Sequence, residues 1–313
     1  MAAPDPAHSN GTRGMPAQIS FREVTKRYGK TTALDKVSID VSGPGVVALL
    51  GPNGAGKTTF LKLLNRLSFP SSGEITVNGF SIDKNAAKVL GMMASQVDET
   101  RFHPYLSGRE ILRFVASLRG INGDAIEKRI EEVSSRTGIS PFLDNLYGTY
   151  SSGMKQKFAN ASALVPDSPI ISFDEPTANL DPAGVVEFRS IIEDLKAREK
   201  LVLISSHILS EVRSFGNRIL IINAGRIVFD SSRDALEKYL SIRLESTPES
   251  MPEKIKGVSE VQANGDVLIL KPKDGVSNST VISELLKSGL KIREVSEVES
   301  LEKAYISRVS NEK

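Results

Sequence analysis

A glycine-rich loop between two apolar segments constrains the fold of this 313-residue chain more than any other feature. Residues 51–59 match the pattern G-x-x-x-x-G-K-[ST]. The run before them, 46–50, is apolar without alternation and predicts a strand covered on both faces, and the run after them, 60–67, predicts an amphipathic helix. This order places backbone N–H groups at a helix N-terminus, where the helix dipole favours an anion. We therefore expect a phosphate-binding loop in an α/β fold, because a glycine-rich turn that matches by chance would lack these flanking elements.

The residue types in the loop predict how it holds a nucleotide. The glycines let the backbone fold into a nest of N–H donors. The ammonium group of Lys57 would reach the β- and γ-phosphates, and the hydroxyl group of Thr58 would bind Mg²⁺. The expected nucleotide-binding residues of the loop are Gly51, Pro52, Asn53, Gly54, Ala55, Gly56, Lys57, Thr58 and Thr59.

Two adjacent carboxylates follow a second buried strand. The apolar run 169–173 ends at Asp174 and Glu175, and open α/β sheets bind ligands at the carboxyl ends of their strands. In enzymes with such a phosphate loop the aspartate of this strand completes the Mg²⁺ shell, so Asp174 is the expected metal ligand. Glu175 points the other way along the pleat and is expected to orient and polarise the attacking water. The alternative is a solvated pair of acids at a strand end, which the loop upstream disfavours.

The order of further short motifs over about 18–230 resembles the nucleotide-binding subunit of an ATP-binding cassette (ABC) transporter. Tyr28 lies where that family stacks an aromatic ring on adenine, Gln96 where its Q-loop glutamine approaches Mg²⁺ and the water, and His207 where its switch histidine lies. The structural alternatives are a surface aromatic, a glutamine without function and a satisfied histidine at a strand end. The resemblance implies catalytic roles for Glu175, His207 and Gln96, and Mg²⁺ ligation by Thr58, Gln96 and Asp174.

A signature-like segment, Tyr-Ser-Ser-Gly-Met, begins at Tyr150. It occupies the place of the family's Leu-Ser-Gly-Gly-Gln and departs from it at the first, third and fifth positions. Ser151 and Gly153 keep a hydroxyl group and an unobstructed N–H for a γ-phosphate. The alternative is a helix N-cap after a loop. The resemblance implies nucleotide contacts by Tyr28, Ser151, Ser152, Gly153 and, in the D-loop, Asp181.

One phosphate loop and one signature in each chain imply, through the resemblance, that the signature of one protomer faces the loop of another. The expected assembly is a homodimer, or a heterodimer with a paralogue, that holds two ATP molecules. A separate transmembrane permease subunit is implied, and it is expected to dock on the segment from Val97 to Leu118. Phe102, Pro104 and Tyr105 either anchor this subunit or pack inside. The expected location is cytoplasmic, peripheral on the cytoplasmic face of a membrane.

Pattern changes along the chain predict its domains. Residues 1–16 show no apolar periodicity and no apolar core of a secretory signal, which predicts a flexible tail. Residues 17–240 form the expected P-loop NTPase domain of ABC ATPase type, with a mixed sheet core, an antiparallel β subdomain that includes a strand over 74–80, and a helical subdomain at about 98–165. A short helix over 233–240 is expected to end it.

A Ser/Pro/Glu-rich stretch predicts a linker over 241–254, before a small α+β domain over 255–313. That domain resembles the one appended to exporter ATPases of the daunorubicin-resistance type. The alternative is a simple dimer-stabilising appendage. Its expected elements are strands over 258–261, 267–270 and 291–295, an Asn-Gly turn at 264–265, and helices over 280–288 and 301–310.

Composition excludes several classes of protein. The absence of cysteine rules out disulfides, thiolate zinc sites and a cysteine nucleophile. Forty Lys and Arg against 38 Asp and Glu leave a net charge of +2, so no nucleic-acid partner is expected. No apolar run approaches the roughly 18 residues that a membrane-spanning helix needs.

The function that the residues and the resemblance favour is ATP hydrolysis that energises transport, with export favoured by the signature and the small domain. One alternative is a soluble ABC ATPase with a ribosome- or DNA-associated role, but the doubled cassette or long coiled coil of such proteins is not seen in the sequence. Another is a kinase or GTPase, in which Ser151, Asp181 and His207 would have no use.

Overall fold

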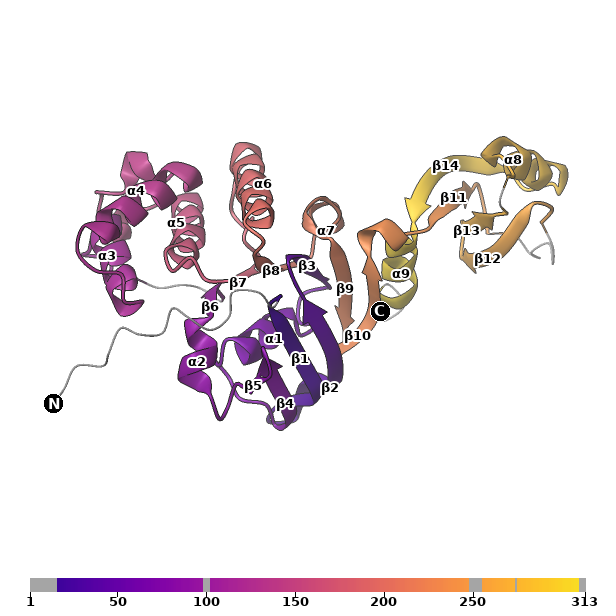
Figure 1. Ribbon diagram of the computed structural model, residues 1–313. Coiled ribbons are helices and arrows are strands. Elements are labelled where there is room, and N and C mark those ends of the chain that lie inside the picture. The colour runs from indigo at the N-terminus through magenta and orange to yellow at the C-terminus, as the bar shows by residue number, and fades with distance from the viewer. Residues whose placement is uncertain (1–15, 98–101, 248–254, 274, 310–313) are drawn as a thin grey trace. The chain divides into compact units, whose positions relative to one another are not determined.

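The computed structural model describes residues 16–97, 102–247, 255–273 and 275–309. Residues 1–15 of the expected tail, 98–101 of the expected docking segment and 248–254 of the expected linker lie outside these ranges. The chain divides after Asp230 into two compact units, earlier than the boundary expected at residue 240 (Figure 1).

A six-stranded sheet forms the centre of the first unit, with the strand order β10-β9-β3-β8-β7-β6. The pairs β9·β3, β3·β8, β8·β7 and β7·β6 are parallel. All their carboxyl ends therefore meet at one edge, as the sequence requires for a nucleotide site. The strands are β3 (Gly45–Leu50), β6 (Met93–Gln96), β7 (Ile170–Asp174), β8 (Leu201–Ser206), β9 (Arg218–Asn223) and β10 (Arg226–Ser232).

Both faces of this sheet are covered, which confirms the prediction from the unalternated apolar runs. Successive residues of a strand point to opposite faces, and the neighbours Val202 and Leu203 of β8 accordingly belong to two different hydrophobic cores. One core joins the sheet to helix α1 (Lys57–Leu64) and to an antiparallel sheet. The other joins it to a layer of helices.

The antiparallel sheet has the order β2-β1-β4-β5. Its strands are β1 (Gln18–Tyr28), β2 (Thr31–Ser42), β4 (Ser72–Val77) and β5 (Phe80–Ser81). Phe21 of β1 stacks on Phe60 of α1 with ring centroids 4.2 Å apart, which fixes this sheet on the helix. The single strand expected over 74–80 is wrong, because Asn78 and Gly79 adopt positive φ angles of 50° and 77° and turn the chain between β4 and β5.

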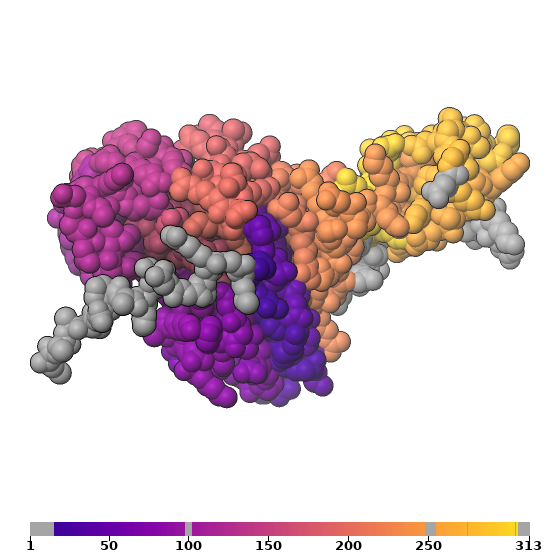
Figure 2. Space-filling model, viewed as in Figure 1, coloured from indigo at the N-terminus to yellow at the C-terminus, as the bar shows by residue number. Residues whose placement is uncertain are grey.

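The helical layer contains α3 (Gly108–Leu118), α4 (Asp124–Thr137) and α5 (Ser152–Leu164), which lie together at the upper left of Figure 1. Figure 2 shows this layer in magenta and the antiparallel sheet in indigo and purple as adjoining masses of the first unit. Ser107 and Glu110 form the predicted capping box at the start of α3. Two 3₁₀ turns, Ser140–Phe142 and Tyr147–Thr149, connect α4 to α5. The unit's other helices are α2 (Ala86–Gly91), α6 (Pro182–Ala197) and α7 (Leu209–Phe215).

An aromatic cluster holds the helical layer together. Phe158 of α5 is fully buried, and its ring lies 5.4 Å from Phe102, 5.6 Å from Tyr147 and 5.7 Å from Tyr150, between centroids. Phe102 thus packs inside, whereas Tyr105 is 78% exposed. The Tyr150 hydroxyl donates to the carbonyl of Phe142 (2.8 Å). Burial raises the pKa of Tyr150 to about 12, so the hydroxyl keeps its proton at neutral pH.

The second unit is a four-stranded antiparallel sheet, order β12-β13-β11-β14, with two helices. The elements are β11 (Lys238–Leu244), β12 (Val258–Asn264), β13 (Val267–Pro272), α8 (Asn278–Lys287), β14 (Ile292–Glu299) and α9 (Ser300–Val309). Gly265 and Asp266 turn the chain between β12 and β13, one residue later than the Asn-Gly turn expected at 264–265, because Asn264 still pairs with Val267. Val281 and Leu285 of α8 pack on the sheet.

The helix expected over 233–240 and the linker expected from 241 are wrong. Only Arg233–Ala235 makes a 3₁₀ turn, and Lys238–Leu244 is the central strand β11. Leu240, Ile242 and Leu244 alternate along it and face the core that α8 covers. Pairing with β13 and β14 on its two sides decides the strand conformation, and the local sequence does not reveal these partners.

Within the described ranges, no helix has both the length and the apolar character needed to cross a membrane.

We expect Phe158→Ala to destabilise the first unit by about 3–5 kcal/mol, because the change removes a fully buried ring and leaves a cavity in the aromatic cluster. The free energy of unfolding, from urea denaturation followed by circular dichroism, measures this effect. Phe114→Ala on α3 is the matched control: its ring is 62% exposed, so a change within about 0.5 kcal/mol is expected. Equal effects of the two changes would contradict the packing described here.

Candidate active site

The glycine-rich loop leads from β3 into α1, and the backbone around Gly56 shapes it. Gly56 precedes α1 with φ of 112°, and a Cβ atom there would lie 2.6 Å from the carbonyl oxygen of Ala33. Only glycine fits this conformation and this close approach. The Lys57 ammonium group, 6% exposed, donates to the carbonyl oxygens of Gly51 (2.8 Å) and Pro52 (3.2 Å). The lysine side chain is therefore held against the backbone of its own loop.

Glu175 links three elements at the carboxyl edge of the sheet. Its carboxylate oxygen Oε1 lies 3.4 Å from Nζ of Lys57, and Oε2 lies 2.8 Å from Nδ1 of His207, which follows β8. The side chain is 25% exposed, so the group is accessible to a small molecule. The structure thus brings together a cation from the loop, a carboxylate after β7 and an imidazole after β8.

Asp174 and Gln96 lie side by side at the same edge. The amide oxygen of Gln96, at the end of β6, accepts a hydrogen bond from the backbone N–H of Asp174 (3.1 Å). Both side chains are buried. A carboxylate and an amide oxygen from adjacent strands are donors of the kind that Mg²⁺ prefers. Thr58, the third expected ligand, is the second residue of α1.

The expected signature residues lie at the start of a helix. Ser151 is the N-cap of α5, and its hydroxyl accepts from the backbone N–H of Met154 (3.2 Å). Ser152 and Gly153 are the first residues of that helix. Asp181 caps α6 in the same way and accepts from the N–H of Gly184 (2.8 Å). Two helix N-termini thus carry the signature and the D-loop.

Tyr28 is a half-exposed aromatic at the end of β1. Its ring is 47% exposed and its hydroxyl lies 3.2 Å from Oγ of Ser68. The ammonium group of Lys26 lies 4.7 Å from the ring centroid. Lys26 thus lies over one face of the ring, and the half-exposed position is compatible with the expected adenine contact.

Sequence reasoning missed two polar side chains that touch the residues around Glu175. Ser205, near the end of β8, forms hydrogen bonds with both Asp174 and Glu175. Asn160 of α5 is buried, and its amide donates to the carbonyl of Pro176 (2.8 Å). Asn160 interrupts the apolar residues of α5, and a buried amide of this kind is the signal that could have drawn attention to it.

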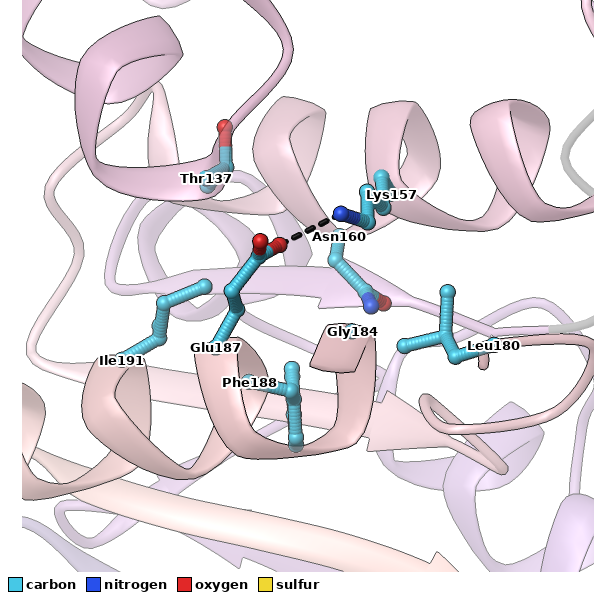
Figure 3. Close-up of a pocket in the computed structure, with 8 residues that line it drawn as sticks. All are labelled: Thr137, Lys157, Asn160, Leu180, Gly184, Glu187, Phe188 and Ile191. Atoms are coloured by element: carbon cyan, nitrogen blue, oxygen red, sulfur yellow. Dashed lines mark hydrogen bonds and ion pairs between the residues drawn. The ribbon is translucent and has the colours of Figure 1, made fainter. Parts of the chain in front are cut away.

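A small cavity lies between α5 and α6, beside Asn160 (Figure 3). Lys157 of α5 forms an ion pair with Glu187 of α6 across it. Its volume is about 10 Å³, so it holds at most one water and is no substrate site. The lining residues are Thr137, Lys157, Asn160, Leu180, Gly184, Glu187, Phe188 and Ile191.

The chain is similar in sequence to a known protein family and to named relatives. The family model described as "ABC transporter" matches residues 34–178. The ABC transporter ATP-binding protein NatA of Bacillus subtilis (strain 168) is 38% identical over 207 residues, which cover 65% of this chain and 83% of NatA. The bacitracin transport ATP-binding protein BcrA of Bacillus licheniformis is 36% identical over 231 residues, 72% of this chain and 74% of BcrA.

Among solved structures, one described as the ATP binding subunit of an ABC transporter superposes with a TM-score of 0.64. It is 26% identical and covers 69% of this chain and 90% of its own. The predicted α/β fold of ABC ATPase type is confirmed by this likeness and by the family match. The chain belongs to the ABC transporter family, as an ATP-binding subunit that hydrolyses ATP and serves transport.

Proposed function

We propose that the residues at the carboxyl edge of the first unit's sheet carry out the ATP hydrolysis, and that a dimer of chains couples it to export through a separate membrane subunit. The observation that carries this proposal is the contact of Glu175 with both Lys57 and His207, at 3.4 Å and 2.8 Å. Loop cation, carboxylate and imidazole converge where an α/β sheet binds its ligand.

Each of these side chains has a chemical task. The N–H groups of the loop and the Lys57 ammonium bind the phosphates and neutralise their charge. Glu175 accepts a proton from the attacking water and orients it. His207, within hydrogen-bond distance of Glu175, fixes the direction of that carboxylate and presents its other ring nitrogen to the γ-phosphate. Positioning and electrostatic stabilisation thus account for the catalysis.

Three oxygen donors support a Mg²⁺ site, namely Thr58, Gln96 and Asp174. Gln96 and Asp174 are joined by the hydrogen bond between β6 and β7, which places both at the edge. When bound, Mg²⁺ supplies positive charge to the β- and γ-phosphate oxygens. The protein's part is to hold the hydroxyl, the amide and the carboxylate next to the loop.

The position of the signature at a helix N-terminus supports a dimer. Ser151 and Gly153 open α5, where free N–H groups and the helix dipole favour an anion. In the proposed assembly these groups meet the γ-phosphate bound by the partner chain, and Asp181 lies at the same interface. ATP then joins the two chains through charge-assisted bonds, and loss of phosphate lets them part. The partner is a second copy or a paralogue.

A surface groove supports docking of a membrane subunit on the helical layer. The groove has a volume of about 470 Å³ and lies between α2, β6 and the end of α3. Phe114 and Leu118, one helical turn apart on α3, are 62% and 69% exposed, and Leu118 lines the groove. Exposed apolar side chains beside a groove fit an amphipathic segment of a partner. In the proposed assembly the chain is a peripheral subunit on the cytoplasmic face of a membrane.

Export is the proposed direction. BcrA, a relative, is by its name a bacitracin transport protein. The Tyr150–Met154 form of the signature and the small second unit resemble the exporter ATPases of the daunorubicin-resistance type. The comparisons favour this transport role over the soluble ribosome- or DNA-associated alternative.

Glu175→Gln is expected to bind ATP but to hydrolyse it at least about 100-fold more slowly, because the amide cannot accept the proton of the water. ATP binding is measured by titration with a fluorescent ATP analogue, and hydrolysis by phosphate release. With ATP the variant should elute as a dimer on a sizing column. A fully active Glu175→Gln would remove Glu175 from the proposed role.

The double change Phe114→Ser/Leu118→Ser is expected to abolish membrane-subunit binding and leave basal ATP hydrolysis unchanged, because both side chains are exposed and neither belongs to the proposed catalytic or nucleotide-binding residues. Binding is measured by purifying the tagged chain with ATP from detergent-solubilised membranes and identifying polytopic membrane proteins by mass spectrometry. Leu286→Ser on α8, where the side chain is also exposed (54%), is the control and should keep the partner. Recovery of ribosomal or DNA-associated partners alone would favour the soluble alternative.

A further inference from the structure

Ser205 lies at the centre of the site without having been among the expected residues. It is the second-to-last residue of β8 and is fully buried. In the parallel pairing of β7 with β8, Ser205 is in register with Asp174. Residues in register on adjacent parallel strands present their side chains to the same face, so the hydroxyl group is held against the carboxylate.

The hydroxyl group of Ser205 bonds to both carboxylate residues at once. Its Oγ lies 2.5 Å from Oδ1 of Asp174 and 3.0 Å from the backbone nitrogen of Glu175. A carboxylate can only accept and a backbone N–H can only donate. The serine therefore donates its single proton to Asp174 and accepts from Glu175. Its orientation is fixed by the chemistry of its two partners.

The bond to Glu175 acts on a backbone position that is otherwise unfavourable. Glu175 has a φ of 48°, in the left-handed region that a non-glycine residue rarely adopts. Such a conformation persists only when its surroundings hold it. Ser205 holds the N–H of this residue, and the resulting turn directs the Glu175 carboxylate towards Lys57 and His207.

We propose that Ser205 is a positioning residue for ATP hydrolysis, which fixes the Asp174 carboxylate and the Glu175 turn relative to each other through one hydroxyl group. This inference rests on the proposed roles of Asp174 and Glu175. The serine touches neither phosphate nor water in this scheme. It supports two consecutive residues, the last residue of β7 and the one that follows it, whose side chains point in different directions.

The test compares Ser205→Ala with a matched serine, Ser172→Ala. Ser172 is also fully buried in the same sheet, on β7, and its hydroxyl accepts from the amide of Asn65 (2.8 Å). That amide also bonds to the carbonyl of Leu61 (2.9 Å), so Ser172→Ala removes a buried hydroxyl group without stranding its partner or touching the site. Ser205→Thr keeps the hydroxyl group and serves as the rescue variant.

Ser205→Ala is expected to lower kcat by about 10- to 100-fold and to leave the KM for ATP within about threefold, the range seen when a support of a metal or catalytic ligand is removed. The change should also weaken Mg²⁺ binding by about tenfold. Mg²⁺ binding is measured in a Glu175→Gln background, which does not turn over ATP, by titrating Mg²⁺ into the ATP-bound chain. The Mg²⁺ concentration that gives half of the rise in melting temperature is compared between the variants. Ser172→Ala and Ser205→Thr should stay within about threefold of the parent in both measurements.

A Ser205→Ala chain with unchanged kcat and Mg²⁺ requirement overturns the inference, and so does an equal loss in Ser172→Ala. If Ser205→Ala does not fold, Ser205→Cys decides, because a thiol fills the site but is a weak donor and acceptor. A Ser205→Cys chain with parental kcat and Mg²⁺ requirement then overturns it. Asp174→Asn and Glu175→Gln are assayed alongside to separate the two proposals. If these variants stay active, the proposed catalytic and metal-binding roles of Asp174 and Glu175 are wrong. If they are inactive and Ser205→Ala is active, only the proposed role of Ser205 is wrong.

Discussion

The carboxylate of Glu175 lies between the Lys57 ammonium group and the His207 ring, and the rest of the first unit serves to keep it there. Three parallel strands position the ammonium group, the carboxylate and the imidazole ring at the carboxyl edge of the sheet. β3 leads into the loop that ends at Lys57, β7 ends at Asp174, and β8 ends just before His207. These strands are adjacent in the sheet order, so groups far apart in sequence come within hydrogen-bond distance only because the sheet is parallel and in register. The two cores that cover its faces make that register rigid.

The chemistry of the site could be predicted because its motifs are local. A glycine-rich loop between strand and helix, and an acidic pair after an apolar run, can each be recognised in fewer than about a dozen consecutive residues. The support of the site could not be predicted in this way. The left-handed backbone of Glu175 and the two bonds of Ser205 depend on the register of β7 with β8, a pairing between distant segments. The short strand β6 could not be predicted either, because the four residues Met-Ala-Ser-Gln carry no strand signal of their own and form a strand only by pairing with β7.

In the second unit a local sequence pattern predicts the wrong secondary structure. The residues 233–240 are compatible with a helix, yet β11 becomes the central strand because partners on both sides pair with it. Tertiary pairing thus overrides local preference. Asn-Gly dipeptides show the same limit of a local signal. The one at 264–265 predicts a turn that lies one residue later in the structure, at 265–266. The one at 78–79 lies within the strand expected over 74–80 and is itself the turn between β4 and β5.

The alternation of β8 between two cores has a consequence for how such a sequence can diverge. Val202 and Leu203 are neighbours along the chain, but each packs against a different set of residues. A change of volume at one position is compensated by residues of the helical layer, and at the other by residues of α1 and the antiparallel sheet, so substitutions in the two sets accumulate almost independently. The helical layer, on which we propose that a membrane subunit docks, can therefore change its interior while the core around α1 and the antiparallel sheet keeps its own packing intact.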